Sequence, residues 1–101
     1  MRMKVDKQGR RLTIGLIGEI DHHAAGKLRE MTDAEIISDN PSELVLDFTE
    51  VDFMDSSGFG FVMGRYKLMA TMGGSVLVTG ATGQVRKMLE LSGAGRYVRI
   101  Q

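Results

Sequence analysis

Apolar residues alternate with polar ones near the start of the chain, which is the spacing of a β-strand. Leu12, Ile14 and Leu16 occupy every second position, and residues 3–5 alternate in the same way. The polar, glycine-containing stretch 6–10 separates the two runs and is typical of a turn. The pattern therefore predicts an N-terminal β-hairpin.

The rest of the chain alternates between helical and strand patterns. Apolar residues at helical spacing predict helices, and short continuous apolar runs predict buried strands. The predicted helices cover 22–37, 57–72 and 84–92, and the predicted strands cover 44–48, 75–79 and 97–100. The order ββαβαβαβ predicts an α/β fold: a mixed, mostly parallel sheet of about five strands with helices packed against it. We expect one domain over residues 1–101.

The first predicted helix has a recognisable start and an apolar face. Asp21 stands directly before it and is a good N-cap candidate. The apolar residues at roughly helical spacing are Ala25, Leu28, Met31 and Ala34. Charged residues lie between them, which is typical of a helix.

Composition excludes several classes of function. The 101 residues are 43% apolar, enough for one core, and 13 basic residues balance 13 acidic ones. We therefore expect no direct nucleic-acid partner and no membrane partner. The chain has no cysteine and no membrane-length apolar run. We expect no signal peptide, and we expect a cytoplasmic protein without disulfides.

A dinucleotide-binding motif is suggested by residues 76–83, Val-Leu-Val-Thr-Gly-Ala-Thr-Gly. The third glycine of that motif should fall at position 86, where this chain has Arg86. A long side chain there would block the close helix–strand packing that glycine permits. We therefore expect a simple strand–turn–helix junction and no cofactor.

Residues 54–60, Met-Asp-Ser-Ser-Gly-Phe-Gly, are the most informative stretch. They follow an apolar strand and precede an apolar helix, so Ser56 and Ser57 lie at a helix N-terminus. Asp55 or Ser56 is expected to cap that helix, and Gly58 to let it pack closely. A phosphate added to a serine there would be electrostatically favoured.

A second polar stretch is expected beside this one. Residues 18–23, Gly-Glu-Ile-Asp-His-His, also follow a predicted strand. The loops after parallel strands share one edge of a sheet. Asp21, His22 and Ser56 are therefore expected at the same edge.

Two catalytic or metal-binding interpretations are weighed against a binding role. Ser56, with His22 or His23 and Asp21 or Asp55, could form a hydrolytic triad. However, no Gly-x-Ser-x-Gly elbow precedes the serine, and so small a domain has little room for a substrate pocket. Adjacent histidines on a helix point in different directions, so we expect no metal site.

The second predicted helix is apolar on two sides. One stripe fits the core, and another is formed by Phe61, Leu68 and Met72. A helix that is apolar on two sides is either deeply buried or keeps one side for a partner. The pattern leaves both possibilities open.

Several of these stretches together resemble anti-sigma factor antagonists. The loop and helix at 53–60 and 64–67 resemble the family's phosphorylation loop and second helix. Residues 18–23 resemble the first-helix entry of its sporulation branch, and residues 85–93 resemble its third helix. The resemblance covers nearly the whole chain and implies a STAS-domain fold.

The resemblance also implies a partner-switching role rather than an enzyme activity. In such proteins the first serine of the pair, here Ser56, is phosphorylated by an anti-sigma factor that is itself a serine kinase. The unmodified form binds this kinase and releases the sigma factor, and a metal-dependent phosphatase restores it. The expected partner-binding residues are Asp21, His22, Asp55, Ser57, Gly58 and Phe61.

Two further expectations complete this interpretation. We expect the free protein to be a monomer that serves sporulation or stress transcription control. The alternatives are a small Ser/His/Asp hydrolase and a STAS-type adaptor that is never phosphorylated.

Overall fold

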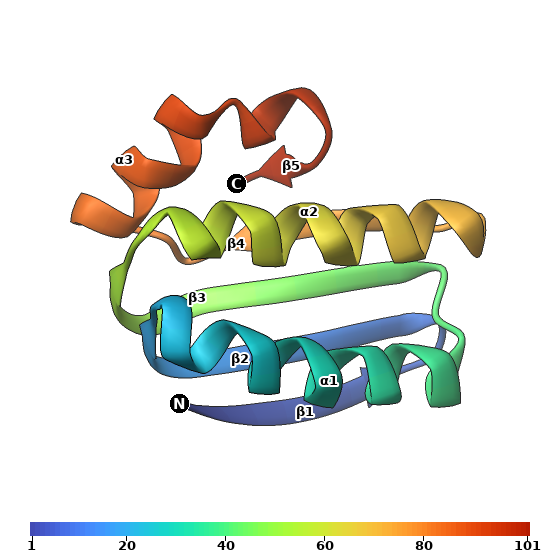
Figure 1. The fold of residues 1–101 in the computed structure, drawn as a ribbon. Coiled ribbons are helices and arrows are strands. Elements are labelled where there is room, and N and C mark those ends of the chain that lie inside the picture. The colour runs from blue at the N-terminus through green and yellow to red at the C-terminus, as the bar shows by residue number, and fades with distance from the viewer.

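Five strands form one mixed sheet whose spatial order follows the chain order, β1-β2-β3-β4-β5 (Figure 1). The computed structural model describes all residues 1–101. β1 pairs antiparallel with β2, and every other neighbouring pair is parallel. The predicted fold class is therefore confirmed. The strands are β1 (Arg2–Gln8), β2 (Arg11–Ile20), β3 (Glu43–Met54), β4 (Ser75–Thr79) and β5 (Arg99–Ile100).

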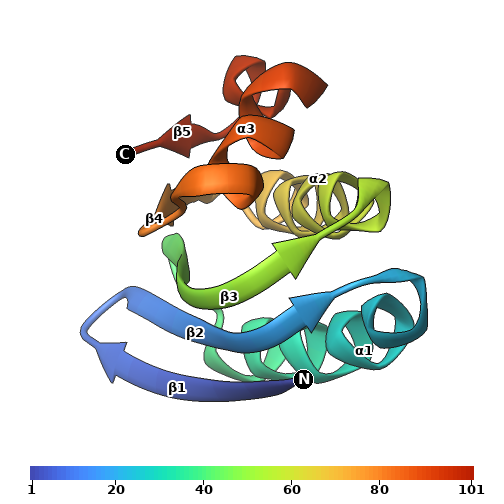
Figure 2. The same cartoon turned by 90° about the vertical axis from the view of Figure 1, so that its left-hand side faces the viewer.

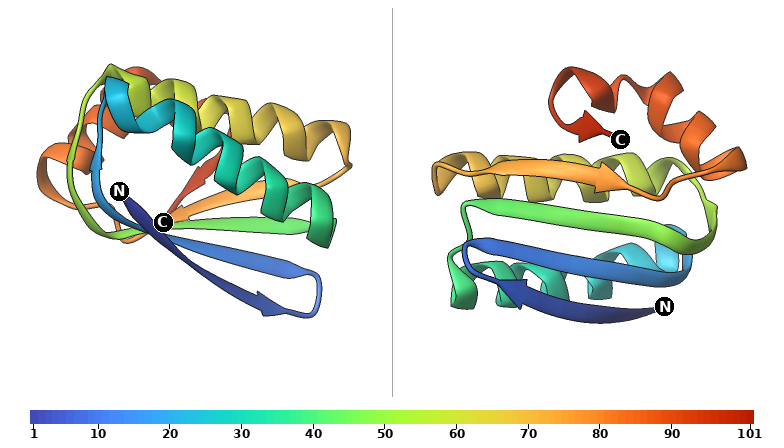
Figure 3. Two further views of the ribbon diagram at one scale, coloured as in Figure 1. Left: turned by 60° about the horizontal axis from the view of Figure 1, so that its bottom comes forward. Right: turned by 180° about the vertical axis from the view of Figure 1, so that it is seen from behind.

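Three α-helices connect the parallel strands in the predicted order. They are α1 (His22–Asp39), α2 (Ser56–Thr71) and α3 (Gly83–Ser92), and a short 3₁₀ helix, η1 (Ala94–Arg96), follows α3. α1 and α2 run side by side over one face of the sheet, and the view from behind shows the other face without helices (Figure 3). None of the helices combines the length and the apolar character needed to cross a membrane.

The N-terminal hairpin is tighter than predicted. Residues 6–8 belong to β1, because they pair with the start of β2 as far as Gln8 opposite Arg11. Only Gly9 and Arg10 remain in the turn, and Gly9 has φ 62°. That left-handed conformation favours glycine and allows the chain to reverse within two residues.

β3 extends well beyond its predicted end at residue 48. It stays paired with β2 as far as Met54, with two irregularities in register on the way. Exposed polar residues such as Glu50 and Asp52 interrupt the apolar pattern in this second half. Pairing with β2, rather than burial on both faces, keeps it extended.

The last predicted strand is mostly a turn. The N–H groups of Tyr97 and Val98 both donate to the carbonyl of Ala94 at 3.0 Å. The chain is therefore tightly wound until Val98, and β5 has only Arg99 and Ile100.

α1 buries only part of the apolar set that marks it in the sequence. Its buried residues are Leu28, Thr32 and Ile36, whereas Ala34 is exposed. The hydroxyl of Thr32 donates to the carbonyl of Leu28 at 2.9 Å, so this polar side chain is buried without losing a hydrogen bond. Thr32 therefore takes the place of an apolar residue on the inner face.

The second apolar stripe of α2 packs within the domain. Phe61 is only 4% exposed, and Leu68 and Met72 are partly buried against the core. α2 lies between α1 and α3 in the end-on view (Figure 2), so both of its sides have neighbours. Of the two possibilities left open by the pattern, the buried helix is correct.

Candidate functional site

β2 and β3 end side by side, and the candidate site begins where they end. Ile20 is the register partner of Met54, and the N–H of Asp55 donates to the carbonyl of Ile20 at 3.2 Å. Asp21 and Asp55 therefore leave the sheet at the same edge and lead into α1 and α2 (Figure 2). The predicted proximity of these two loops is confirmed.

Each of these aspartates caps the helix that follows it. Asp21 Oδ1 accepts the N–H of Ala24 at 2.9 Å, and Asp55 Oδ1 accepts the N–H of Ser57 at 2.8 Å. Helix N-termini leave N–H groups without partners inside the helix, and a carboxylate satisfies one of them. The structure thus decides between the two candidate caps of α2 in favour of Asp55.

Ser56 is consequently free of a capping role. It is the first residue of α2, it is exposed, and its hydroxyl makes no hydrogen bond within the protein. Ser57 is half-buried and donates its backbone N–H to the cap. The two serines differ accordingly: the hydroxyl of Ser56 is open to a partner, whereas Ser57 is part of the cap.

The carboxylate of Asp55 also joins the two helices. Its second oxygen, Oδ2, accepts the backbone N–H of His22 in the first turn of α1 at 3.2 Å. One side chain therefore accepts hydrogen bonds from the N-termini of both α1 and α2. This arrangement brings His22 beside the Ser56 loop, as the sequence predicts.

Hydrogen bonding favours the ionised form of Asp55. The bond from the Ser57 N–H holds the pKa of Asp55 below its ordinary value of 3.8. The bond from the His22 N–H and the charge of the His22 imidazolium act in the same direction, and partial burial opposes them. Asp55 is therefore a carboxylate at neutral pH.

Gly58 and Met54 fix the depth at which α2 meets the sheet. Met54 is 1% exposed, and a Cβ atom on Gly58 would overlap the Cγ and Sδ atoms of its side chain. Glycine therefore permits a contact that any larger residue would push apart. The predicted close packing at Gly58 is confirmed, and it places Gly58 beneath the surface.

Phe61, one turn beyond Gly58 in α2, is buried beside Arg65. The guanidinium carbon of Arg65 lies 5.2 Å from the centroid of its ring. Arg65 is 3% exposed and forms an ion pair with Asp33 of α1, with Nε and Oδ1 2.8 Å apart. Burial lowers the pKa of Arg65, and the charge of Asp33 opposes this. The pair joins α1 to α2 behind the site.

Two contributing residues were missed by the sequence interpretation. Arg65 occupies a helical position that could equally face solvent, and only the tertiary fold shows that it is buried. Gln84 of α3 binds the backbone of Met54 through its side-chain amide. No periodicity marks a glutamine with that role, so the sequence carried no signal for it.

The arrangement gives no support to hydrolysis or metal binding. Ser56 makes no hydrogen bond to His22 or His23, whose rings lie 6.0 Å apart at an interplanar angle of 64°. No group of three or more potential ligand residues gathers anywhere in the structure. Ser56 stands outside both of the two main pockets.

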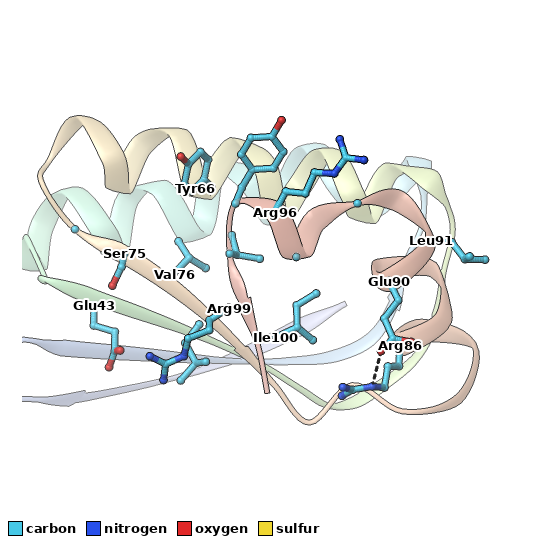
Figure 4. Close-up of a pocket in the computed structure, with 16 residues that line it drawn as sticks. Glu43, Tyr66, Ser75, Val76, Arg86, Glu90, Leu91, Arg96, Arg99 and Ile100 are labelled. Atoms are coloured by element: carbon cyan, nitrogen blue, oxygen red, sulfur yellow. Dashed lines mark hydrogen bonds and ion pairs between the residues drawn. The ribbon is translucent and has the colours of Figure 1, made fainter.

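The larger pocket lies away from the predicted site. It has a volume of about 950 Å³ and is lined mainly by β4, α3, η1 and β5 (Figure 4). A smaller pocket of about 460 Å³ includes Asp21 and His23. Only the smaller pocket therefore touches the edge where α1 begins.

Curated relatives carry a common description. The chain is 35% identical over 102 residues to an anti-sigma F factor antagonist of Paenibacillus polymyxa, which covers 99% of this chain and 87% of the relative. It is 31% identical over 87 residues to an anti-sigma F factor antagonist of Lysinibacillus sphaericus, covering 86% and 74%.

Solved structures agree with these relatives. The unphosphorylated form of the anti-sigma factor antagonist SpoIIAA matches with a TM-score of 0.83 and 29% identity, covering 99% of this chain and 88% of that one. The phosphorylated form of the Bacillus cell fate determinant SpoIIAA matches with a TM-score of 0.73 and 28% identity, covering 99% and 91%. Residues 2–101 match the STAS domain. The resemblance found in the sequence is confirmed, and the chain belongs to the STAS-domain family.

Proposed function

We propose that this protein is an anti-sigma factor antagonist whose binding to an anti-sigma factor is switched off by phosphorylation of Ser56. The observation that carries the proposal is the exposed, unbonded hydroxyl of Ser56 at the first position of α2. The names of the relatives and the two states in which SpoIIAA was solved support it.

The fold can accept a phosphate at Ser56 without rearrangement. A phosphoserine carries about −1.5 to −2 charges at neutral pH. The N-terminus of α2 carries a partial positive charge, and a negative group there is stabilised by roughly 0.3–1 kcal/mol. Asp55 adds a nearby negative charge that opposes this gain. The net effect on folding is therefore small.

The effect on a partner is larger. Two like charges about 6 Å apart at an effective dielectric constant of about 20 repel by roughly 3 kcal/mol. That energy corresponds to about a hundredfold loss of affinity, and desolvation of the phosphate adds to it. Phosphorylation is therefore expected to prevent binding rather than to unfold the protein.

The partner surface that we assign surrounds Ser56 at the shared edge of β2 and β3. Asp21, His22, Asp55 and Ser57 would contact the anti-sigma factor directly. Gly58 and Phe61 would act from beneath, because both are buried, and Gly58 sets how closely α2 packs against Met54. In this proposal the anti-sigma factor is a serine kinase, and a metal-dependent phosphatase removes the phosphate.

The biological setting follows from the same proposal. The free antagonist would be a monomer in the cytoplasm, where it would release a sigma factor during sporulation or stress. Phosphorylated and unmodified protein in size-exclusion chromatography with light scattering would test the monomeric state. A stable dimer of the unmodified form would contradict it.

Phosphosite mapping tests the central assignment. The chain is mixed with a purified anti-sigma factor kinase and Mg-ATP, and the modified residue is identified by mass spectrometry. We expect modification of wild type and Ser57→Ala, and none of Ser56→Ala. Modification at another residue would refute the assignment of Ser56, and binding without any modification would identify an unphosphorylated adaptor instead.

A further inference from the structure

The side chain of Gln84 completes the hydrogen bonding of β3 at a point where the neighbouring strand has ended. β3 pairs with β4 only from Glu43 to Asp47, but it stays paired with β2 as far as Met54. Gln84, in the first turn of α3, lies on the side of β3 where β4 would have continued. Its Nε2 donates to the carbonyl of Met54 at 2.7 Å, and its Oε1 accepts the N–H of Met54 at 3.2 Å.

This pair of bonds acts on the residue that sets the start of α2. Met54 immediately precedes the Asp55 cap, and its buried side chain lies against Gly58. The backbone of Met54 therefore leads directly into the Asp55 cap and the first turn of α2. Ser56 is the first residue of that turn.

We propose that Gln84 is a positioning residue that orients the Ser56 hydroxyl for phosphorylation by holding the backbone of Met54. This inference rests on the proposed function. Phosphoryl transfer depends on alignment of the attacking oxygen with the transferred group. Because Gln84 makes no bond to Ser56 itself, its loss is expected to lower kcat for phosphorylation more than it raises KM.

Substitutions at Gln84 separate the two bonds. Gln84→Met preserves the length of the side chain and removes both bonds. Gln84→Glu, ionised at neutral pH, keeps an acceptor for the Met54 N–H but cannot donate to the Met54 carbonyl. Lys87→Met is the matched control, because Lys87 is exposed on the same helix and makes no hydrogen bond or ion pair through its side chain.

Amide hydrogen exchange and phosphorylation kinetics are then measured on all four proteins. For Gln84→Met we expect about tenfold faster exchange of the Met54 amide, shifted amide resonances at Asp55 and Ser56, and about tenfold lower kcat with little change in KM. Gln84→Glu sets a carboxylate oxygen against the Met54 carbonyl, so it should be at least as impaired as Gln84→Met, whereas Lys87→Met should match wild type.

Three results would overturn the inference. One is unchanged exchange of the Met54 amide in Gln84→Met, and another is faster exchange with unchanged kcat. A raised KM at constant kcat would also refute it, since that pattern denotes direct contact with the kinase. If wild type is not phosphorylated at all, the proposed function fails, and the exchange data still decide whether Gln84 holds Met54.

Discussion

Asp55 and His22 are joined across two helices by a hydrogen bond of 3.2 Å from the His22 backbone N–H to Asp55 Oδ2. The same carboxylate caps α2 through Ser57. Substitution of Asp55 is therefore expected to disturb the N-termini of both α1 and α2. His22 and Ser57, two of the residues assigned to partner binding, are therefore both held by the ionised carboxylate of Asp55.

The ionised carboxylate of Asp55 should make the stability of the fold depend on pH. The pKa of Asp55 is lowered in the folded state, so the unfolded state binds its proton more readily. Its contribution is fully present above the ordinary value of 3.8 and is lost as pH falls through the lower folded pKa. We expect Asp55→Asn to be less stable than wild type at pH 7 and the difference to shrink below pH 3.8. Urea unfolding at several pH values measures both.

An unchanged stability difference between pH 7 and acid would show that Asp55 acts only as a neutral hydrogen-bond acceptor. Asparagine is a good N-cap, so this variant preserves the bond to Ser57. Its side-chain amide cannot accept the His22 N–H in the same way if its oxygen faces Ser57. Comparison of Asp55→Asn with wild type therefore measures the combined loss of the negative charge and of the hydrogen bond to α1, while the α2 cap is kept.

Ser56→Asp should separate binding from folding. A carboxylate at Ser56 imitates part of the phosphate charge, and we expect about a hundredfold weaker binding to the anti-sigma factor. The melting temperature should change by no more than a few degrees, because the helix N-terminus tolerates the charge. Isothermal titration calorimetry and thermal melting measure the two effects. Ser56→Asn is the control of equal size, and an equal loss of affinity in it would contradict the electrostatic explanation.

The buried ion pair between Arg65 and Asp33 predicts an asymmetric double-mutant cycle. Asp33→Ala leaves a guanidinium that is 3% exposed without its carboxylate. We expect Asp33→Ala to lower the free energy of unfolding by about 2 kcal/mol. The loss is smaller than for a fully buried pair because the Asp33 side chain is 32% exposed. Adding Arg65→Met to Asp33→Ala should recover stability. A double variant less stable than Asp33→Ala would show that Arg65 contributes mainly through its contact with Phe61.

Two glycines in the same helix should respond in opposite directions to alanine. Gly58→Ala would force a Cβ against Met54 in the core. We therefore expect the free energy of unfolding to fall by about 1–3 kcal/mol. Gly60→Ala places a Cβ in open space at an exposed position, and we expect a gain of about 0.5–1 kcal/mol. Urea unfolding compares both with wild type. Equal effects would contradict the close contact at Gly58.

Periodicity was sufficient to predict the order of elements and the edge at which the site forms. The apolar runs of β2 and β4 and the cap at Asp21 are local features, and the sequence shows them directly. The length of β3 is not local, because its polar second half is extended only through pairing with β2. The same holds for Phe61, whose burial in the core depends on how α2 packs in the fold.

The details of the site depended on contacts between distant elements. The sequence offered Asp55 and Ser56 as equal candidates for the cap, and the choice required the geometry of the turn. Thr32 and Arg65 are polar by composition, but each is buried with a specific partner. Gln84 of α3 binds Met54 of β3, and no residue spacing in the sequence predicts that contact.

The antiparallel direction of β1 has a practical consequence for experiments. It brings Met1 back to the edge where β2 ends, close to Gly18 and in the same pocket as Asp21 and His23. An affinity tag or fluorophore fused to the amino end would therefore project across the surface assigned to the anti-sigma factor. Gln101 follows β5, at the other end of the strand order, so immobilisation through the carboxyl end would leave that surface accessible.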